Sequence, residues 1–135
     1  VYNEHIIRVP RRLTVFSAEL VEWSLVRVTI GEQVSTHAVG LRTRDVDREG
    51  GYVLTSPIRE IDRAKSRLTT RSSVYDLVRP IDDIPADLLD HWVRLVVLRA
   101  RTEPDRIEFL KSDGSGGRSM EHAEIEAATQ AWRRL

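Results

Sequence analysis

The sequence predicts an α+β fold, a small bent antiparallel sheet or barrel followed by a helix, a short strand and a C-terminal helix. Three observations predict it. Segments rich in β-branched and aromatic residues alternate with short turns over residues 1–79. Apolar residues then recur at helical spacing from residue 86, and a second stretch with this spacing closes the chain after residue 119.

The β half contains several short candidate strands. A weakly alternating segment at 4–9 comes first, and the strongest candidate is 21–30. A short turn joins it to 34–43, so these two strands should pair antiparallel. A further candidate, 52–58, contains Pro57, which has no N–H for a ladder hydrogen bond and therefore predicts an edge, a bulge or the end of the strand.

Two loops and a hairpin complete this half. Residues 45–51 are an acidic, glycine-ended loop, and the mostly charged residues 59–65 indicate a connector. Residues 67–77 then predict a hairpin. Its tip is Arg71-Ser72, and the period of two places Tyr75 and Leu77 inward and Asp76 outward.

A helix is predicted after Pro80. Two aspartates precede Ile84-Pro85, and a proline in the first turn with acids nearby is typical of a helix start. We expect the helix to end near Ala100. The alternative is a strand over 93–101 that TEPD turns into 106–111. The predicted apolar face comprises Leu88, Leu89, Trp92, Val93, Leu95 and Val96, and the polar face Asp87, Asp90, His91 and Arg94.

The C-terminal part predicts a strand over 105–110, a flexible linker over 112–118 and a helix over 119–135 capped by Ser119. Residues 1–111 are then one α+β domain, with a β-rich core over 1–79 and a helix-strand extension over 80–111.

Composition excludes several classes of protein. The 135 residues include no cysteine, so a disulfide framework, a thiolate zinc site and a cysteine nucleophile are all excluded. No apolar run is long enough to cross a membrane. The first residues lack the apolar core of a signal peptide, although a preceding segment stays open because the chain starts at Val1. We expect a cytoplasmic protein without membrane contact.

The candidate catalytic and metal motifs have plainer interpretations. The four histidines are scattered, and Asp87, Asp90 and His91 match the solvated face of a helix at least as well as a metal site. The glycine-rich SDGSGGRS lacks the spacing of a phosphate-binding loop. The serines at 56, 72 and 73 lack a nucleophile elbow. We therefore expect no catalytic residue, metal or cofactor, and a hydrolase or transferase stays a third hypothesis.

Two charged sets are candidate binding residues. The net charge is zero, which removes the simplest argument for nucleic-acid binding. Local clusters remain, however, and either could contact a partner. The basic set comprises Arg59, Arg63, Lys65, Arg67 and Arg71, and the acidic set comprises Asp82, Asp83, Asp87 and Asp90.

One part of the chain resembles a known pattern. TSPI at 55–58, a short charged connector and TTRSSVYDL at 69–77 resemble a pattern in short, mostly uncharacterised bacterial proteins encoded on phages, plasmids or integrated elements. The matching residues of the second segment are Thr69, Ser73, Tyr75 and Leu77, whereas Arg71-Ser72 replaces the usual glycine-containing turn.

The resemblance covers about residues 20–78 and implies an SH3-like β-barrel with a mobile-element accessory role. It carries no active site to transfer. Together with the lack of catalytic groups, it predicts a non-enzymatic protein-binding accessory or inhibitor that acts on a host defence or regulatory complex. The alternative is a nucleic-acid-binding barrel that uses the basic set. The oligomeric state stays open, with a dimer among the alternatives.

Overall fold

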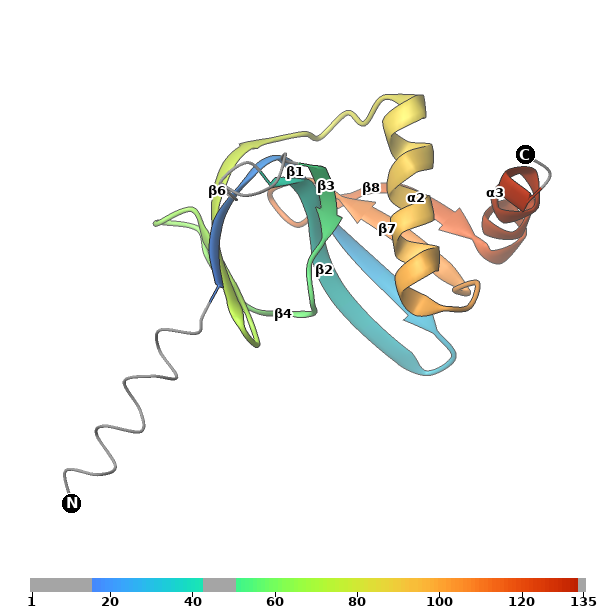
Figure 1. Ribbon diagram of the computed structural model, residues 1–135, viewed down its shortest axis with the longest axis horizontal. Helices are drawn as coiled ribbons and strands as arrows, with labels where there is room; N and C mark the ends of the chain where they lie inside the picture. The colour runs from blue at the N-terminus through green and yellow to red at the C-terminus, as the bar shows by residue number, and fades with distance from the viewer. Residues whose placement is uncertain (1–15, 43–50, 134–135) are drawn as a thin grey trace, which may run out of the picture.

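The structure is a computed structural model that describes residues 16–42 and 51–133. It confirms the α+β class, with a strongly bent eight-stranded sheet and two helices in the described residues (Figure 1). The predicted strand at 4–9 and most of the loop at 45–51 lie outside them. The elements are β1 (Phe16–Ile30), β2 (Gln33–Arg42), β3 (Gly51–Leu54), β4 (Ile58–Asp62), β5 (Arg67–Thr70), β6 (Ser73–Pro80), α2 (Ala86–Ala100), β7 (Arg106–Leu110), β8 (Gly116–Glu121) and α3 (His122–Arg133).

The long strand β1 organises the sheet. The strand order is β3-β2-β1-β6-β5-β4, and β1 also pairs with β7, which in turn pairs with β8. The first half of β1 runs parallel to β6, whereas its second half is antiparallel to β7. The expectation of a purely antiparallel sheet is therefore wrong at β1–β6, where the two paired strands are far apart in the sequence.

The change of partner coincides with a bulge in β1. Pairing with β2 shifts register between Val21 and Ser24, and Glu22 has a φ of 51°. A non-glycine residue in this region is uncommon and bends the strand away from its line. Before the bend, Ala18 and Leu20 belong to one hydrophobic cluster. Past it, Val26 and Val28 belong to the other, while Leu25 still belongs to the first.

The first cluster lies between the sheet and α2, and the second lies inside the bent sheet. Trp92, Val93 and Val96 of α2 are buried against β1 and β7, which confirms the predicted apolar face. Tyr75 is buried in the second cluster and Leu77 packs against it, as predicted for the hairpin. The alternative strand over 93–101 is wrong, because α2 continues to Ala100 and Arg101 ends it in the left-handed conformation.

The TSPI segment, residues 55–58, leads from β3 into β4, where the sequence predicted a single strand. The predicted strand 52–58 breaks after Leu54, and Ile58 begins β4, which occupies part of the predicted connector 59–65. Buried Thr55 forms two hydrogen bonds with β2 at this break in the strand. Its N–H donates to Ala38 O at 2.9 Å, and its Oγ1 accepts a hydrogen bond from Ala38 N at 3.0 Å. Pro57 therefore lies in the break between two strands, as its missing N–H requires.

The C-terminal prediction needs a larger correction. The expected linker 112–118 is a turn followed by β8, which pairs antiparallel with β7. Ser119 lies inside β8 rather than at a helix cap, and α3 begins at His122. The misleading feature was the glycine content, since Asp113-Gly114 between two strands is a hairpin signal and Gly114 has a φ of 90°.

Neither described helix is long and apolar enough to cross a membrane.

The imidazole of His37 provides a test of this packing. Its Nδ1 lies 2.9 Å from Thr55 O and its Nε2 2.8 Å from Ser35 Oγ, so the neutral ring satisfies both neighbours. Burial lowers the pKa of His37 below 6.5, Arg99 lowers it further, and the Thr55 carbonyl opposes them. Because the unfolded chain then binds more protons, stability should fall as pH drops through about 6.5.

We predict that His37→Gln loses part of this pH dependence. Thermal unfolding of both proteins between about pH 7.5 and about pH 5.5 measures it. The wild-type midpoint should drop more on acidification than that of the variant, whatever their difference at neutral pH. His91→Gln, at an exposed histidine of α2, is the matched control and should follow the wild type. Parallel curves for wild type and His37→Gln would contradict the assignment.

Candidate functional site

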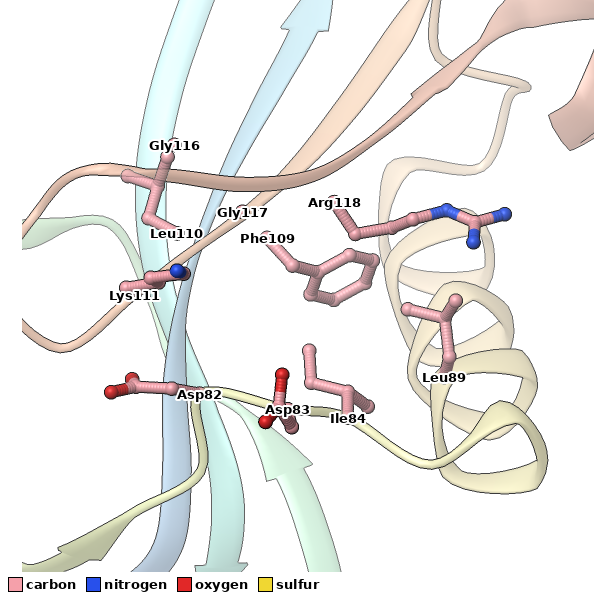
Figure 2. Close-up of a pocket in the computed structure, with 10 residues that line it drawn as sticks. All are labelled: Asp82, Asp83, Ile84, Leu89, Phe109, Leu110, Lys111, Gly116, Gly117 and Arg118. Atoms are coloured by element: carbon pink, nitrogen blue, oxygen red, sulfur yellow. The ribbon is translucent and has the colours of Figure 1, made fainter.

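A groove runs between β8 and the N-terminal part of α2. Two adjoining cavities of about 350 and 320 Å³ share Ile84, Leu89 and Arg118, and together they form what we call the β8–α2 groove. Figure 2 shows the residues that line the first of them. Its lining residues are Asp82, Asp83, Ile84, Ala86, Leu89, Asp90, Val93, Phe109, Leu110, Lys111, Gly116, Gly117, Arg118 and Met120.

The wall before α2 is held from two sides. Ile81 N donates to Trp23 O at 2.8 Å, and Ser24 Oγ donates to Ile81 O at 3.1 Å, which anchors the segment on the bend of β1. The carboxylate of Asp82 then accepts two hydrogen bonds, from Ser112 N at 2.8 Å and from Ser112 Oγ at 3.4 Å. These bonds link the β7–β8 turn to the segment leading into α2, so the groove has a fixed width at this end.

The opposite wall is β8, which approaches β7 closely. A Cβ on Gly117 would lie 2.5 Å from Phe109 O, so only glycine fits there without a shift of the backbone. Asp113 lies in the turn between β7 and β8, where its carboxylate accepts hydrogen bonds from Ser115 N at 2.8 Å and from Ser115 Oγ at 2.6 Å. These two hydrogen bonds also lower the pKa of the Asp113 carboxyl.

The floor is apolar and the two rims carry opposite charges. Phe109 lies across the floor, and Figure 2 shows Arg118 extending from β8 toward the helix that carries Leu89. On the α2 side, exposed Asp83 and Asp90 form no ion pair within the described part of the chain. On the β8 side, Arg118 lies 3.6 Å from Glu124.

β8, which lines this groove, has a free edge. Within residues 16–42 and 51–133, β8 pairs only with β7, so its other edge has no strand partner. Residues 116–119 are exposed. A short run of backbone N–H and C=O groups is therefore available for pairing beside an apolar floor.

The structure divides the predicted acidic set. Asp82, Asp83 and Asp90 line the β8–α2 groove, whereas Asp87 lies with His91 and Tyr52 around a separate cavity. Tyr52 Oη donates to Glu22 there at 3.1 Å, and burial together with this carboxylate raises the pKa of Tyr52. The metal grouping of Asp87, Asp90 and His91 that the sequence left open is thus spread over two sites.

The predicted basic set is also divided. Arg63, Lys65 and Arg67 lie at the β4–β5 turn, whereas Arg59 and Arg71 lie toward the other end of that hairpin. Arg67 Nε is 3.3 Å from Asp76, and Arg63 donates to Ser112 O. Two of the five cations are therefore engaged within the chain, and no single basic surface collects all of them.

Sequence reasoning missed Lys111 and Arg118 as groove residues. Both lie within or beside the predicted linker 112–118, and a flexible linker has no defined face on which a side chain could be placed. The Asp-Gly pair at 113–114 was the signal that could have found the hairpin and, through the period of two, the alignment of Arg118 with Met120.

No protein-family model, curated protein or solved structure matches this chain. The resemblance of residues 20–78 to mobile-element proteins therefore stays a prediction.

Chemically, the groove offers recognition groups. An apolar floor can bury side chains, the unpaired edge can bond a backbone, and the charged rims can orient a ligand.

Adjacent glycines test the close approach of β8 to β7. Gly117→Ala should lower the free energy of unfolding by about 1–3 kcal/mol, because the added Cβ meets the Phe109 backbone. Gly116→Ala is the matched control, since a Cβ there meets nothing within 4 Å, and its change should stay within about 0.5 kcal/mol. Urea denaturation measures both, and equal losses would contradict the described packing.

The divided basic set predicts weak nucleic-acid binding. Fluorescence anisotropy with labelled single-stranded DNA and RNA at two salt concentrations should show dissociation constants no tighter than about 100 μM. Submicromolar binding that weakens steeply with salt, and that Arg59→Ala/Arg71→Ala abolishes, would instead support the nucleic-acid alternative.

Proposed function

We propose that this protein is a non-enzymatic protein-binding module of the accessory or inhibitor type. It binds an extended segment of its partner, with alternating apolar and basic residues, by adding that segment to the free edge of β8. The observation that carries the proposal is that β8 has an unpaired edge and also lines the β8–α2 groove with its apolar floor.

Strand addition uses the backbone for affinity and the groove for selection. An added strand bonds the unpaired N–H and C=O groups of β8, and every second side chain then points to the groove side. Natural proteins usually cover or charge such edges, because exposed ones pair with other chains. β8 instead presents two glycines, which leave its backbone accessible.

Charge favours basic residues in the partner. Residues 80–91 contain four aspartates and no lysine or arginine, and three of the carboxylates line the groove. Asp82 is engaged by Ser112, whereas Asp83 and Asp90 have no cationic partner in the described residues. Lysine or arginine side chains at the α2 side of the bound segment would complete these pairs.

The wider role rests on the resemblance alone. We propose that the partner belongs to a host defence or regulatory complex and that the gene is carried by a bacterial mobile element. The lack of an assembled catalytic constellation in the sequence and the recognition groups of the groove support a binding role.

The test uses a synthetic library of eight-residue peptides in which apolar residues alternate with lysine or arginine. The tightest binder is then N-methylated at each position in turn. Because only every second backbone N–H of an added strand points to β8, affinity should fall at least tenfold at alternate positions and little at the others. Fluorescence anisotropy gives the dissociation constants.

Asp83→Asn/Asp90→Asn should weaken the same peptide about 2- to 30-fold, as expected for two exposed ion pairs. Glu60→Gln, at an exposed acid on β4, is the matched control and should leave binding unchanged. The proposal fails if no library peptide binds, or if neither N-methylation nor the aspartate substitutions change the affinity of the best binder. Stable dimerisation through β8, measured by sedimentation, would identify a second copy as the occupant and overturn our choice.

A further inference from the structure

Three potential ligands converge at the start of α3. Glu103 lies between α2 and β7, His122 is the first residue of α3, and Glu126 lies one turn later. Their ligand atoms all lie within 4.8 Å of one another. This is the only such group of at least three histidine or acidic residues in the described chain, and none of its members lines the β8–α2 groove.

The orientation of the His122 ring favours coordination. Its Nδ1 lies 3.2 Å from Pro104 O, and since a carbonyl only accepts, Nδ1 carries the hydrogen. Nε2 is then the nitrogen with a free lone pair. Metal-bound histidines are commonly held by a backbone carbonyl in this way, which fixes the tautomer and the direction of the ring. Pro104 is fully buried, so the carbonyl is a stable anchor.

Fixed backbone supports the carboxylate of Glu103. Two residues later, Asp105 N donates to Thr29 O at 2.8 Å, and Asp105 Oδ2 accepts Gly31 N at 2.7 Å. The connection after α2 is thereby tied to the β1–β2 hairpin. The other carboxylate, Glu126, follows His122 by four residues, so the two share one face of α3.

The local charge leaves room for a cation. The group contains two carboxylates and one imidazole. The one cationic side chain paired with it in the described residues is Arg133, whose Nη2 is 3.9 Å from Glu103 Oε2. The Arg133 side chain is 71% exposed and the distance is at the limit for an ion pair, so Arg133 leaves most of the negative charge uncompensated.

We propose that Glu103, His122 and Glu126 bind a divalent transition-metal ion of the zinc class. One imidazole nitrogen and two carboxylate oxygens suit zinc, whereas magnesium and calcium prefer oxygen ligands alone. The exposed positions of His122 and Glu126 allow their side chains to close on the ion. Three protein ligands leave a coordination position for water or for a group of a partner.

The ion would join α3 to the connection after α2. Within α3, the buried residues are Ile125 and Thr129, so its attachment to the rest of the molecule is small. A ligand that binds only the folded arrangement stabilises it, and the metal should therefore slow hydrogen exchange in α3.

The test is calorimetric titration of zinc chloride into the full chain in buffer free of chelators. We expect one ion per chain, with affinity reduced at least tenfold by His122→Ala and by Glu126→Gln, both exposed positions at which folding should survive. His91→Ala, at another exposed histidine, is the matched control and should bind as the wild type does. Zinc should also slow amide exchange in α3 of the wild type and not of His122→Ala.

Several results would overturn the proposal. They are the absence of stoichiometric zinc binding, wild-type affinity in His122→Ala and Glu126→Gln, or an equal loss of affinity in His91→Ala. Calcium or magnesium binding at the same residues in preference to zinc would overturn the choice of ion. Because peptide binding at β8 uses other residues, failure of either proposal leaves the other to its own experiment.

Discussion

The bend in β1 is the constraint on which the rest of the structure depends. Glu22 takes a left-handed conformation there, and the strand exchanges a parallel partner, β6, for an antiparallel one, β7. One continuous strand thus carries both hydrophobic clusters, one inside the bent sheet and one beneath α2. The same bend anchors Ile81 and so directs the chain from β6 toward α2 (Figure 1). Without it, the acidic wall of the β8–α2 groove would have no fixed position.

Both proposed sites depend on the C-terminal hairpin and on the helix that comes after it. The turn between β7 and β8 is held by the Asp82 carboxylate on one side and by Arg63 on the other. β8 then supplies a free edge, and its end determines where His122 begins α3. The proposed peptide-binding edge and the proposed metal site at the start of α3 are therefore successive parts of one segment. An ion at His122 and Glu126 would hold α3, whose Glu124 pairs with Arg118 at the groove rim.

Local sequence patterns predicted the elements in which the period of the apolar side chains matches the period of the backbone structure. The apolar face of α2 was evident because Trp92, Val93 and Val96 follow the helical period and are buried. The hairpin at 67–77 was evident because alternation places Tyr75 inward. The glycine-rich segment misled, since composition alone indicates flexibility while the Asp-Gly pair specifies a turn. The pattern of residues 52–58 predicts one continuous strand, because nothing local reveals that Thr55 forms hydrogen bonds with Ala38 across the sheet.

The sequence by itself determined the α+β class, the start of α2 and its apolar face, the absence of cysteine chemistry and an acidic segment before that helix. These are properties of short windows, in which periodicity, caps and composition act directly. Only the tertiary structure decided that β1 pairs with β6 in parallel, that Asp83 and Asp90 face Arg118 across a groove, and that Glu103 meets His122. These contacts join residues that are far apart in the sequence and that meet only because the two hydrophobic clusters pack together. No local pattern predicts which distant strands pair.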